Sequence, residues 1–319
     1  MKPLPPLSPS ANTSRRRALR AFSSAALAGS AAATAGWPSL LMAAPAAANR
    51  PGSTDPVAER TALPRLVTVG GGITEVVYAL GAQDQLVGTD TTSLYPVAAQ
   101  ATPKVGYMRQ LSAEGLLALR PDALIAGTDA GPPVVIDQLR SAGVRVELVN
   151  ADHSWDEVRR KVLAVGRASG REAAARELQA RLDARWQVVT ARVQAAKSPG
   201  PRVLFVLSHS GSPMVAGEQT AADALIRFIG ARNPLAGFKG YRPMTAEAMA
   251  QAAPDIILTT TQGIEAIGGE AKFWQRPELA LTPAHARRAM VHLDALELLG
   301  FGPRLPDVVE RLHERMVRA

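Results

Sequence analysis

The chain of 319 residues contains no cysteine. Without a thiol it can form neither a disulfide nor the cysteine-linked lipid anchor of a lipoprotein. The five histidines include no His-x-His or His-x-x-x-His pair and lie beside no acidic cluster, which argues against a dedicated zinc or manganese site. The serines Ser208 and Ser210 lack a Gly-x-Ser-x-Gly elbow, so hydrolase chemistry has little support.

Long apolar runs are missing except near the N-terminus. Residues 14–20 read Ser-Arg-Arg-Arg-Ala-Leu-Arg and precede an apolar run, the pattern of a twin-arginine export signal. Small residues at 43–48 offer a cleavage site after Ala48. A membrane anchor is disfavoured because the strongly apolar part is short, rich in alanine and interrupted by Gly and Pro. We therefore expect a mature protein that is soluble in the periplasm.

Removal of the signal peptide also lowers the net charge of the protein. Residues 1–48 hold five basic residues and no acid, so their removal lowers the formal net charge from +8 to +3. A balance this small gives no reason to expect a nucleic-acid partner.

The rest of the chain reads as two similar halves around one long helix. Arg171–Lys197 has no Gly or Pro, is rich in strong helix formers and carries a narrow apolar stripe. Before and after it, Leu111–Ala126 and Met244–Thr259 align without a gap, at one constant offset along the chain. A second pair of segments, 78–88 and 227–237, matches in the same order. Two ordered matches favour a duplicated architecture over a chance recurrence of the helix–Pro-Asp–strand pattern.

Strands alternate with helices in both halves, which predicts parallel, doubly wound sheets. We predict an α/β protein with two Rossmann-like lobes, one long rigid helix as the only covalent crossing between them, and a ligand cleft between the lobes. The predicted segments are a twin-arginine-type signal peptide (1–48), a disordered lead-in (49–63), an N-terminal lobe (64–170), the linker helix (171–197) and a C-terminal lobe (198–319).

Ligands of such sheets lie beyond the carboxyl ends of the strands. The loops expected there are 70–73, 89–110, 208–215, 238–244 and 261–268. Gly70–Gly72 follows a strand and opens a helix, but a dinucleotide fingerprint needs glycine where Glu75 stands. An exported α/β enzyme that binds phosphate at this turn is therefore a weak alternative.

The constant offset of the first aligned pair also places Arg109 on Arg242, each just before a helix that begins with Ala-Glu. One guanidinium on each lobe suits a ligand with two separated carboxylates, because each fork binds a carboxylate through two hydrogen bonds. Two solvated surface arginines are the alternative. His209 follows a strand in a predicted ligand loop, where it could cover a ligand face or have only a structural role.

Tyr107 lies two residues before Arg109 in a chain with only four tyrosines. A phenolate is a hard oxygen donor that suits ferric iron, and tyrosine is one of the known axial ligands of haem. A neighbouring arginine favours the deprotonated form. A tyrosine that merely packs at the edge of a lobe is the other interpretation.

Four segments carry a family resemblance: Val105–Gly115, Gly71–Gly81, Thr220–Ile226 and Gly240–Glu247. With them, nearly the whole mature chain resembles the haem-binding periplasmic proteins of haemin ABC importers. The resemblance implies a carrier without catalysis, whose transported ligand is ferric haem.

By that resemblance Tyr107 is the axial iron ligand, and Arg109 and Arg242 bond to the phenolate or to the haem propionates. Tyr95 and His209 match family positions near the pocket. A ferric siderophore or a corrinoid is the alternative ligand within the same fold, and neither needs a protein ligand to the metal.

The resemblance also implies partners. These are a haemin ABC permease with its ATPase and, upstream, an outer-membrane haem receptor; the carrier itself is expected to be a monomer. Docking onto the permease is expected through one acid on each lobe, Glu75 in the N-terminal lobe and Asp223 in the C-terminal one. Arg227 stands where relatives often carry Glu, so Asp223 takes that place.

Overall fold

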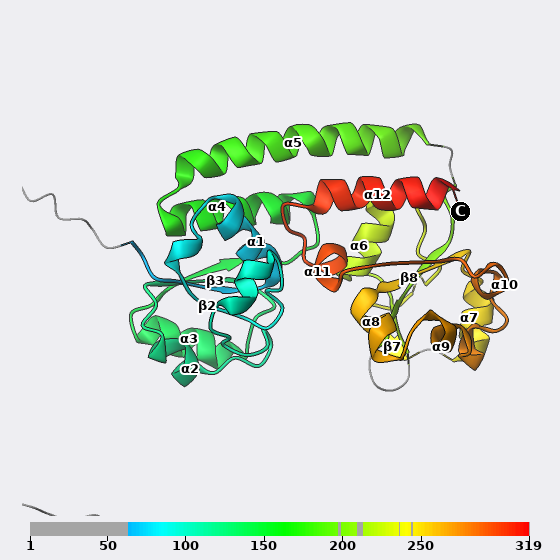
Figure 1. The fold of residues 1–319 in the computed structure, drawn as a ribbon, viewed down its shortest axis with the longest axis horizontal. Coiled ribbons are helices and arrows are strands. Elements are labelled where there is room, and N and C mark those ends of the chain that lie inside the picture. The colour runs from blue at the N-terminus through cyan, green and yellow to red at the C-terminus, as the bar shows by residue number, and fades with distance from the viewer. Residues whose placement is uncertain (1–62, 197–198, 209–212, 236, 244, 319) are drawn as a thin grey trace, which may run out of the picture. The chain divides into compact units, whose positions relative to one another are not determined.

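Two β-sheets, one formed before and one after a long helix, make up the computed structural model (Figure 1). It describes residues 63–196, 199–208, 213–235, 237–243 and 245–318. The predicted signal peptide, and the lead-in up to residue 62, lie outside these residues. No helix in the described part of the chain is long and apolar enough to cross a membrane.

The first sheet has the strand order β2-β1-β3-β4, and all of its strands are parallel. The central strands β1 and β3 are buried along their whole length, as expected for parallel strands that helices cover on both faces. The strands are β1 (Leu66–Val69), β2 (Leu86–Thr89), β3 (Ala123–Gly127) and β4 (Arg145–Val149). The helices of this half are α1 (Gly71–Ala79), α2 (Ala113–Ala118), α3 (Pro133–Ser141) and α4 (Trp155–Ser169), with 3-10 turns at Gln83–Gln85 and Val97–Ala101.

The second sheet has the order β7-β6-β5-β8-β9. Its strands are β5 (Val203–Leu207), β6 (Met214–Ala216), β7 (Tyr241–Pro243), β8 (Ile256–Thr260) and β9 (Met290–Leu293). The helices of this half are α6 (Ala221–Phe228), α7 (Ala246–Ala252), α8 (Thr261–Ala266), α9 (Glu270–Trp274), α10 (Pro283–Arg287), α11 (Ala295–Leu299) and α12 (Leu305–Arg318), with a 3-10 turn at Pro277–Leu279.

The sequence repeat is visible in the structure. The starts of helices α2 and α7 are as far apart in the chain as the starts of strands β3 and β8, and this separation is the offset of the aligned segments. Each half also uses the aspartate of its Pro-Asp pair in the same way. The Asp122 carboxylate accepts the Arg65 backbone N–H at 2.7 Å, and the Asp255 carboxylate accepts the Arg202 backbone N–H at 2.9 Å. The predicted α/β fold with two Rossmann-like halves is therefore confirmed.

The prediction of purely parallel sheets is wrong for the second half. Strand β6 is antiparallel to β5, and β7 is antiparallel to β6. The segments 208–215 and 238–244 that were expected to be loops thus contribute strands, and most of 261–268 is helix α8. Two strands of only three residues each carry too little alternation to be recognised in the sequence.

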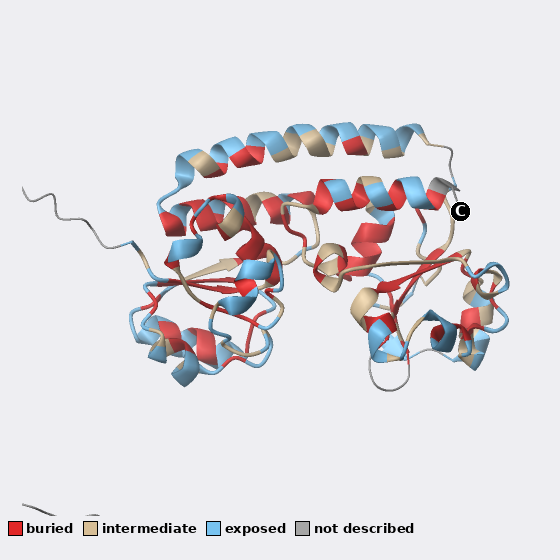
Figure 2. Ribbon diagram, viewed as in Figure 1, coloured by how far each residue is buried: buried red, intermediate tan, exposed pale blue. Residues whose placement is uncertain are grey.

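The long helix α5 (Glu172–Ala195) connects the two halves and packs against α4 and α12. Most of its surface is exposed, as Figure 2 shows. Its narrow apolar stripe joins the cores of both halves. Trp186 of α5 stacks on Trp155 of α4, with ring centroids 4.7 Å apart, and meets Phe228 of α6 edge-on at 4.9 Å. Among the described residues, no strand of one half joins the sheet of the other.

Non-covalent contacts also join the two halves. The segment between α11 and α12 returns to the first half, where the Lys161 ammonium donates to the carbonyls of Gly300 and Phe301 at 2.9 and 3.1 Å. The Phe301 side chain is fully buried in a core that also includes Trp155 and Val158 of the first half. Packing as well as the linker helix therefore holds the two sheets together.

Candidate functional site

Tyr107 and Arg109 lie in the loop between β2 and α2. A hydrogen bond of 2.9 Å from the Thr91 N–H to the Gly106 carbonyl closes the loop, and Gly106 takes a positive φ of 99° that favours glycine. The Tyr107 side chain is 41% exposed. Its phenol oxygen accepts a hydrogen bond of 2.7 Å from Nη1 of Arg109. The exposed phenol oxygen thus lies beside a cation rather than in an apolar core.

The Arg109 guanidinium is held from its other side. Its Nη2 donates to Asp129 Oδ2 at 3.0 Å. Burial alone lowers the pKa of Arg109, but Tyr107 and Asp129 more than offset this and the pKa is raised. The guanidinium is therefore held between the phenol oxygen of Tyr107 and the carboxylate of Asp129. The sequence reasoning missed Asp129, although its position directly after the buried strand β3 was a usable signal.

Tyr95 lies in the same loop and is 45% exposed. The guanidinium carbon of Arg304 lies 3.8 Å from the centroid of the Tyr95 ring. The loop thus presents two exposed aromatic rings, those of Tyr95 and Tyr107. His209, the other residue expected near the pocket, lies outside the described residues.

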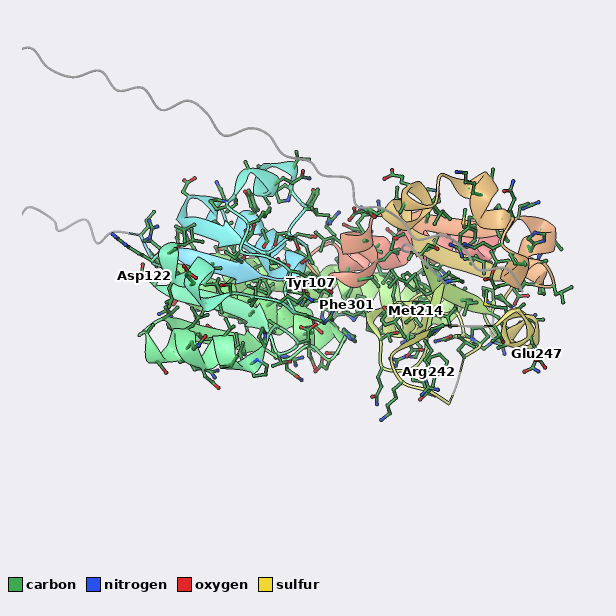
Figure 3. The ribbon with its side chains drawn as sticks, turned by 90° about the horizontal axis from the view of Figure 1, so that it is seen from below. Tyr107, Asp122, Met214, Arg242, Glu247 and Phe301 are labelled. Atoms are coloured by element: carbon green, nitrogen blue, oxygen red, sulfur yellow. The ribbon has the colours of Figure 1, made fainter. Side chains whose placement is uncertain are left out.

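Arg242 belongs to the edge strand β7, whereas Arg109 lies in a turn, so the two arginines do not share a local structure. The Arg242 side chain is exposed, and its guanidinium carbon lies 4.8 Å from the centroid of the Phe238 ring. In Figure 3, Tyr107 lies at the end of the first half nearer to the second, opposite the end with Asp122, and Arg242 lies on the second half.

Tyr241, next to Arg242, is the site residue of the second half that sequence reasoning missed. Successive side chains of a strand point to opposite faces, so Tyr241 turns inward and packs edge-on against Phe205 at 6.4 Å. Burial raises the pKa of Tyr241 to about 12, and the charge of Arg109 and a hydrogen bond with Thr220 oppose the shift. This influence of Arg109 places the loops of the two halves within electrostatic reach of each other.

Glu75 and Asp223, the acids expected to dock onto a permease, are not surface charges. Glu75 is 6% exposed and forms two hydrogen bonds with the Arg304 guanidinium, at 2.6 and 2.9 Å. Asp223 is 7% exposed, accepts from the Asn233 amide at 3.1 Å and pairs with Arg227 at 3.4 Å. Both lie on faces of helices that pack inward, which the sequence pattern around them did not reveal.

The glycine turn leaves no room for a phosphate. A Cβ at Gly71 would lie 2.5 Å from the Leu296 side chain, and one at Gly72 would lie 2.2 Å from the Gly300 carbonyl oxygen. The Gly70 N–H donates to Asp90 at 3.0 Å. These glycines are therefore required by close packing against the second half, and the alternative of a phosphate-binding enzyme loses its site.

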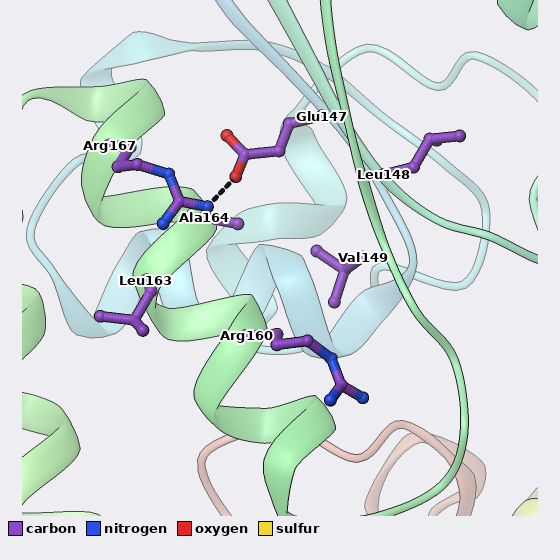
Figure 4. A pocket seen from close by; sticks show the side chains of 7 residues that line it. All are labelled: Glu147, Leu148, Val149, Arg160, Leu163, Ala164 and Arg167. Carbon is purple, nitrogen blue, oxygen red and sulfur yellow. Dashed lines mark hydrogen bonds and ion pairs between the residues drawn. The ribbon is translucent and has the colours of Figure 1, made fainter.

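Two hollows elsewhere are unrelated to these residues. One, of about 130 Å³, lies between the edge strand β4 and helix α4 and contains the ion pair of Arg167 with Glu147 (Figure 4). The other, of about 460 Å³, is lined by Glu270, Ala271, Trp274, Gln275 and Arg288. The first is smaller than a pocket for a drug-sized ligand. Neither includes Tyr107, Arg109 or Arg242.

Comparison with known proteins gives a consistent result. The solved structure of the periplasmic heme-binding protein BhuT in complex with two hemes is 46% identical, with a TM-score of 0.76 over 80% of this chain and 98% of that one. YvrC of Bacillus subtilis, described as an uncharacterized ABC transporter substrate-binding lipoprotein, is 28% identical over 78% of this chain and 79% of its own length. The cobalamin-binding protein of Halobacterium salinarum is 31% identical over 65% of this chain and 58% of its own length.

These relatives are named for binding and transport, in agreement with the expectation of a binding protein rather than an enzyme. Residues 66–296 match the family described as periplasmic binding protein. The match spans both sheets and the helix between them, and the chain belongs to the periplasmic binding protein family.

Proposed function

We propose that this protein binds ferric haem in the periplasm and delivers it to an ABC permease for haem and iron uptake. The observation that carries the proposal is the exposed phenol of Tyr107 with the Arg109 guanidinium 2.7 Å from its oxygen. The likeness to BhuT, whose structure holds two hemes, supports the same ligand.

Each residue has a definite task in this proposal. The Tyr107 phenolate coordinates the ferric iron, which a hard anionic oxygen suits. Arg109, anchored on Asp129, compensates the phenolate charge. Arg242 is exposed and forms no ion pair within the described residues, so its fork is available for a haem propionate. The exposed ring of Tyr95 supplies an apolar surface for the macrocycle.

A corrinoid is the second candidate ligand, because one relative is named a cobalamin-binding protein. A corrinoid or a ferric siderophore arrives with its metal fully coordinated and needs no phenolate. The pairing of Tyr107 with Arg109 is then without purpose, which is why haem is preferred. Titration with cyanocobalamin separates the two ligands, since only a corrinoid carrier would bind it with an affinity that Tyr107→Phe leaves unchanged.

The proposed route to the periplasm begins with the twin-arginine signal at residues 14–20 and cleavage after Ala48. The mature protein is then free of a lipid anchor, because the chain has no cysteine for lipid attachment, and we propose that it acts as a monomer. It collects haem that an outer-membrane receptor has imported. Replacing Arg15 and Arg16 by Lys should leave the precursor in the cytoplasm, and normal periplasmic yield would instead indicate the general secretory route.

The burial of Glu75 and Asp223 moves the proposed permease contact to another pair of acids. Glu114 and Glu247 are equivalent by the sequence repeat, and each is exposed in the first turn of its helix. Charges placed alike on the two halves suit a permease that touches both. Charge reversal at either residue should impair uptake without changing haem affinity, whereas reversal of the exposed Glu177 on α5 should change neither.

Titration of the purified protein with haemin, followed by absorption spectroscopy, tests the proposal. We expect one haem at Tyr107, five-coordinate, with a tyrosinate-to-iron charge-transfer band. Tyr107→Phe keeps the ring and removes the oxygen, so it should abolish the band and weaken binding while apolar burial retains some affinity. A wild-type spectrum in Tyr107→Phe, lost instead in His209→Ala, would mean that histidine holds the iron.

A further inference from the structure

Arg304 lies between α11 and α12 and joins the two halves through its side chain. Its Nε and Nη2 donate to the two oxygens of Glu75, at 2.9 and 2.6 Å, and its Nη1 donates to Glu297 at 2.9 Å. The Glu75 side chain is 5% exposed and that of Arg304 is 24% exposed. A planar guanidinium held by two carboxylates at its edges has one fixed orientation.

The flat face of this guanidinium lies against Tyr95. At 3.8 Å from the ring centroid, the guanidinium carbon is well within the range of a cation–π contact. Tyr95 nevertheless remains 45% exposed. Tyr95 is therefore both held by a cation and accessible to a ligand.

Tyr95 lies in a braced segment that leads directly into Tyr107. The Thr91–Gly106 hydrogen bond closes residues 91–106, which include Tyr95, and Tyr107 is the next residue. Within this loop the Lys104 ammonium donates to the Ser93 carbonyl at 3.1 Å and to the Ala99 carbonyl at 2.9 Å, so the segment that carries Tyr95 is braced from inside.

We propose that Arg304 is a positioning residue of the ligand site, which holds the Tyr95 ring as a flat wall for the bound macrocycle. The inference rests on the proposed function, since it assigns to Tyr95 a place beside a haem. A ring already fixed before binding loses less conformational freedom when the ligand arrives, and this strengthens binding without a new contact. Arg304 itself touches the ring and not the ligand.

The buried carboxylate fits this role. Burial raises the pKa of Glu75, while its hydrogen bonds and ion pair with Arg304 oppose the shift. A buried ion pair is a poor means of stabilising a fold, because apolar residues of the same size do as well or better. A guanidinium that must lie flat against Tyr95, in contrast, requires a carboxylate in the plane of its fork, and Glu75 provides one.

The test compares two single variants with their combination. Arg304→Lys keeps a charge for Glu75 but loses the planar face, and Tyr95→Leu removes the ring but keeps an apolar side chain. We expect each to weaken haemin binding about fivefold, the order of the cost of ordering one side chain on binding. The charge-transfer band of Tyr107 should persist in both. The double variant should bind no more weakly than Tyr95→Leu alone, since Arg304 acts through the ring.

Arg311→Lys is the matched control. Arg311 also donates to Glu297, at 2.9 Å, but has no contact with Tyr95 among the described interactions, and its substitution should leave haemin affinity unchanged. Additive losses in the double variant, or equal losses in the control, would overturn the proposal because they show a general structural effect.

Stability and function can be separated in this design. If Arg304→Lys does not fold, Tyr95→Leu alone tests the proposal, because it changes an exposed ring. Unchanged haemin affinity in this variant overturns the proposal. Weakened affinity with the charge-transfer band intact supports it. If the wild-type protein fails to bind haemin, or Tyr107→Phe keeps its band, the proposed function fails instead. If haem binds through Tyr107 and its affinity does not depend on Tyr95, this inference is refuted but the proposed function stands.

Discussion

The two halves of the molecule agree in their centres and differ at one edge. Three strands have the same parallel order in each, β1-β3-β4 in the first sheet and β5-β8-β9 in the second. On the opposite side the first sheet adds one parallel strand, β2, whereas the second adds the antiparallel pair β6 and β7. The site residues Tyr95, Tyr107 and Arg242 all come from this differing edge.

The difference explains why the halves contribute unequally to the site. After β2 the first half has a long loop that exposes two aromatic rings and places Arg109 on a phenol oxygen. In the second half the corresponding stretch is strand β7, which turns Tyr241 inward and Arg242 outward. A repeated scaffold can therefore present different side chains at the corresponding edge of its two halves.

The largest difference between the halves is expected at α1 and α6, the first helix after the start of each sheet. Glu75→Ala in α1 removes the buried carboxylate that accepts two hydrogen bonds from Arg304, leaves Arg304 with its bond to Glu297, and should lower the free energy of unfolding by about 3 kcal/mol. Asp223→Ala in α6 frees Arg227, whose side chain is 65% exposed, and should cost about 1 kcal/mol. Urea unfolding of both variants measures the two losses in the free energy of unfolding. Equal losses would show that Arg304 is sufficiently held by a partner other than Glu75.

The aspartates of the two Pro-Asp pairs should differ less. Asp122 accepts one backbone hydrogen bond, whereas Asp255 also accepts from the Arg202 side chain at 3.0 and 3.2 Å and pairs with Arg287. We expect Asp255→Ala to lower the free energy of unfolding by about 2 kcal/mol and Asp122→Ala by about 1 kcal/mol.

The side-chain hydrogen bond with Arg202, above all, holds the pKa of Asp255 below its usual value. The carboxylate therefore contributes stability at pH values above about 4 and loses it as the pH falls through the lower folded-state pKa. The gap between Asp255→Ala and wild type should close in acid. A gap that stays constant down to pH 2 would mean that the charge is not what matters.

The sequence predicted the parts of the fold that repeat and are long. The constant offset between the aligned segments located α2 with α7 and β3 with β8, and the absence of Gly and Pro located α5. Strands β6 and β7 were not predicted because three residues show no periodicity. The returning segment with Arg304 could not be foreseen, since its contact with Glu75 joins residues 229 positions apart and leaves no local pattern.

The candidate site was predicted to a similar extent. Tyr107 and Arg109 were singled out by their closeness in the sequence, and the family resemblance implied that Arg109 bonds to the phenolate or to the propionates. The structure places the two side chains in contact. Asp129 and Tyr241 were missed, because their relevance depends on which loops meet in space. Glu75 was misjudged for a related reason: an acid on a short helix reads as solvated unless its buried partner is known.

Arg109 and Arg242 occupy equivalent positions in the sequence repeat, but their substitutions should differ by about tenfold in their effect on haemin affinity. Arg109→Ala removes the charged hydrogen-bond donor of the Tyr107 oxygen, and we expect a loss of about 30-fold, typical of a charge-assisted hydrogen bond. Arg242→Ala removes an exposed propionate contact and should cost about threefold. Haemin titration at low and high salt checks this, and Arg242→Ala should lose its effect at high salt.

The smallest expected effect is the pH dependence of stability that Tyr241, on the edge strand β7, introduces. The pKa of Tyr241 is raised to about 12, mainly by burial, against an ordinary value of 10.0. Between these values the folded protein keeps a proton that the unfolded chain has lost, so the free energy of unfolding falls as the pH rises. At pH 11 this loss amounts to about 1 kcal/mol. Tyr241→Phe cannot ionise and should escape it.

Urea unfolding at pH 9 and pH 11 measures this difference directly. Wild type and Tyr241→Phe should change by different amounts between the two pH values, with the variant losing about 1 kcal/mol less. Tyr78→Phe in α1 is the matched control and should follow wild type. If Tyr241→Phe also follows wild type, the ring of Tyr241 meets water at this edge. The inward orientation of the Tyr241 side chain on β7, a feature in which the second half differs from the first, would then be wrong.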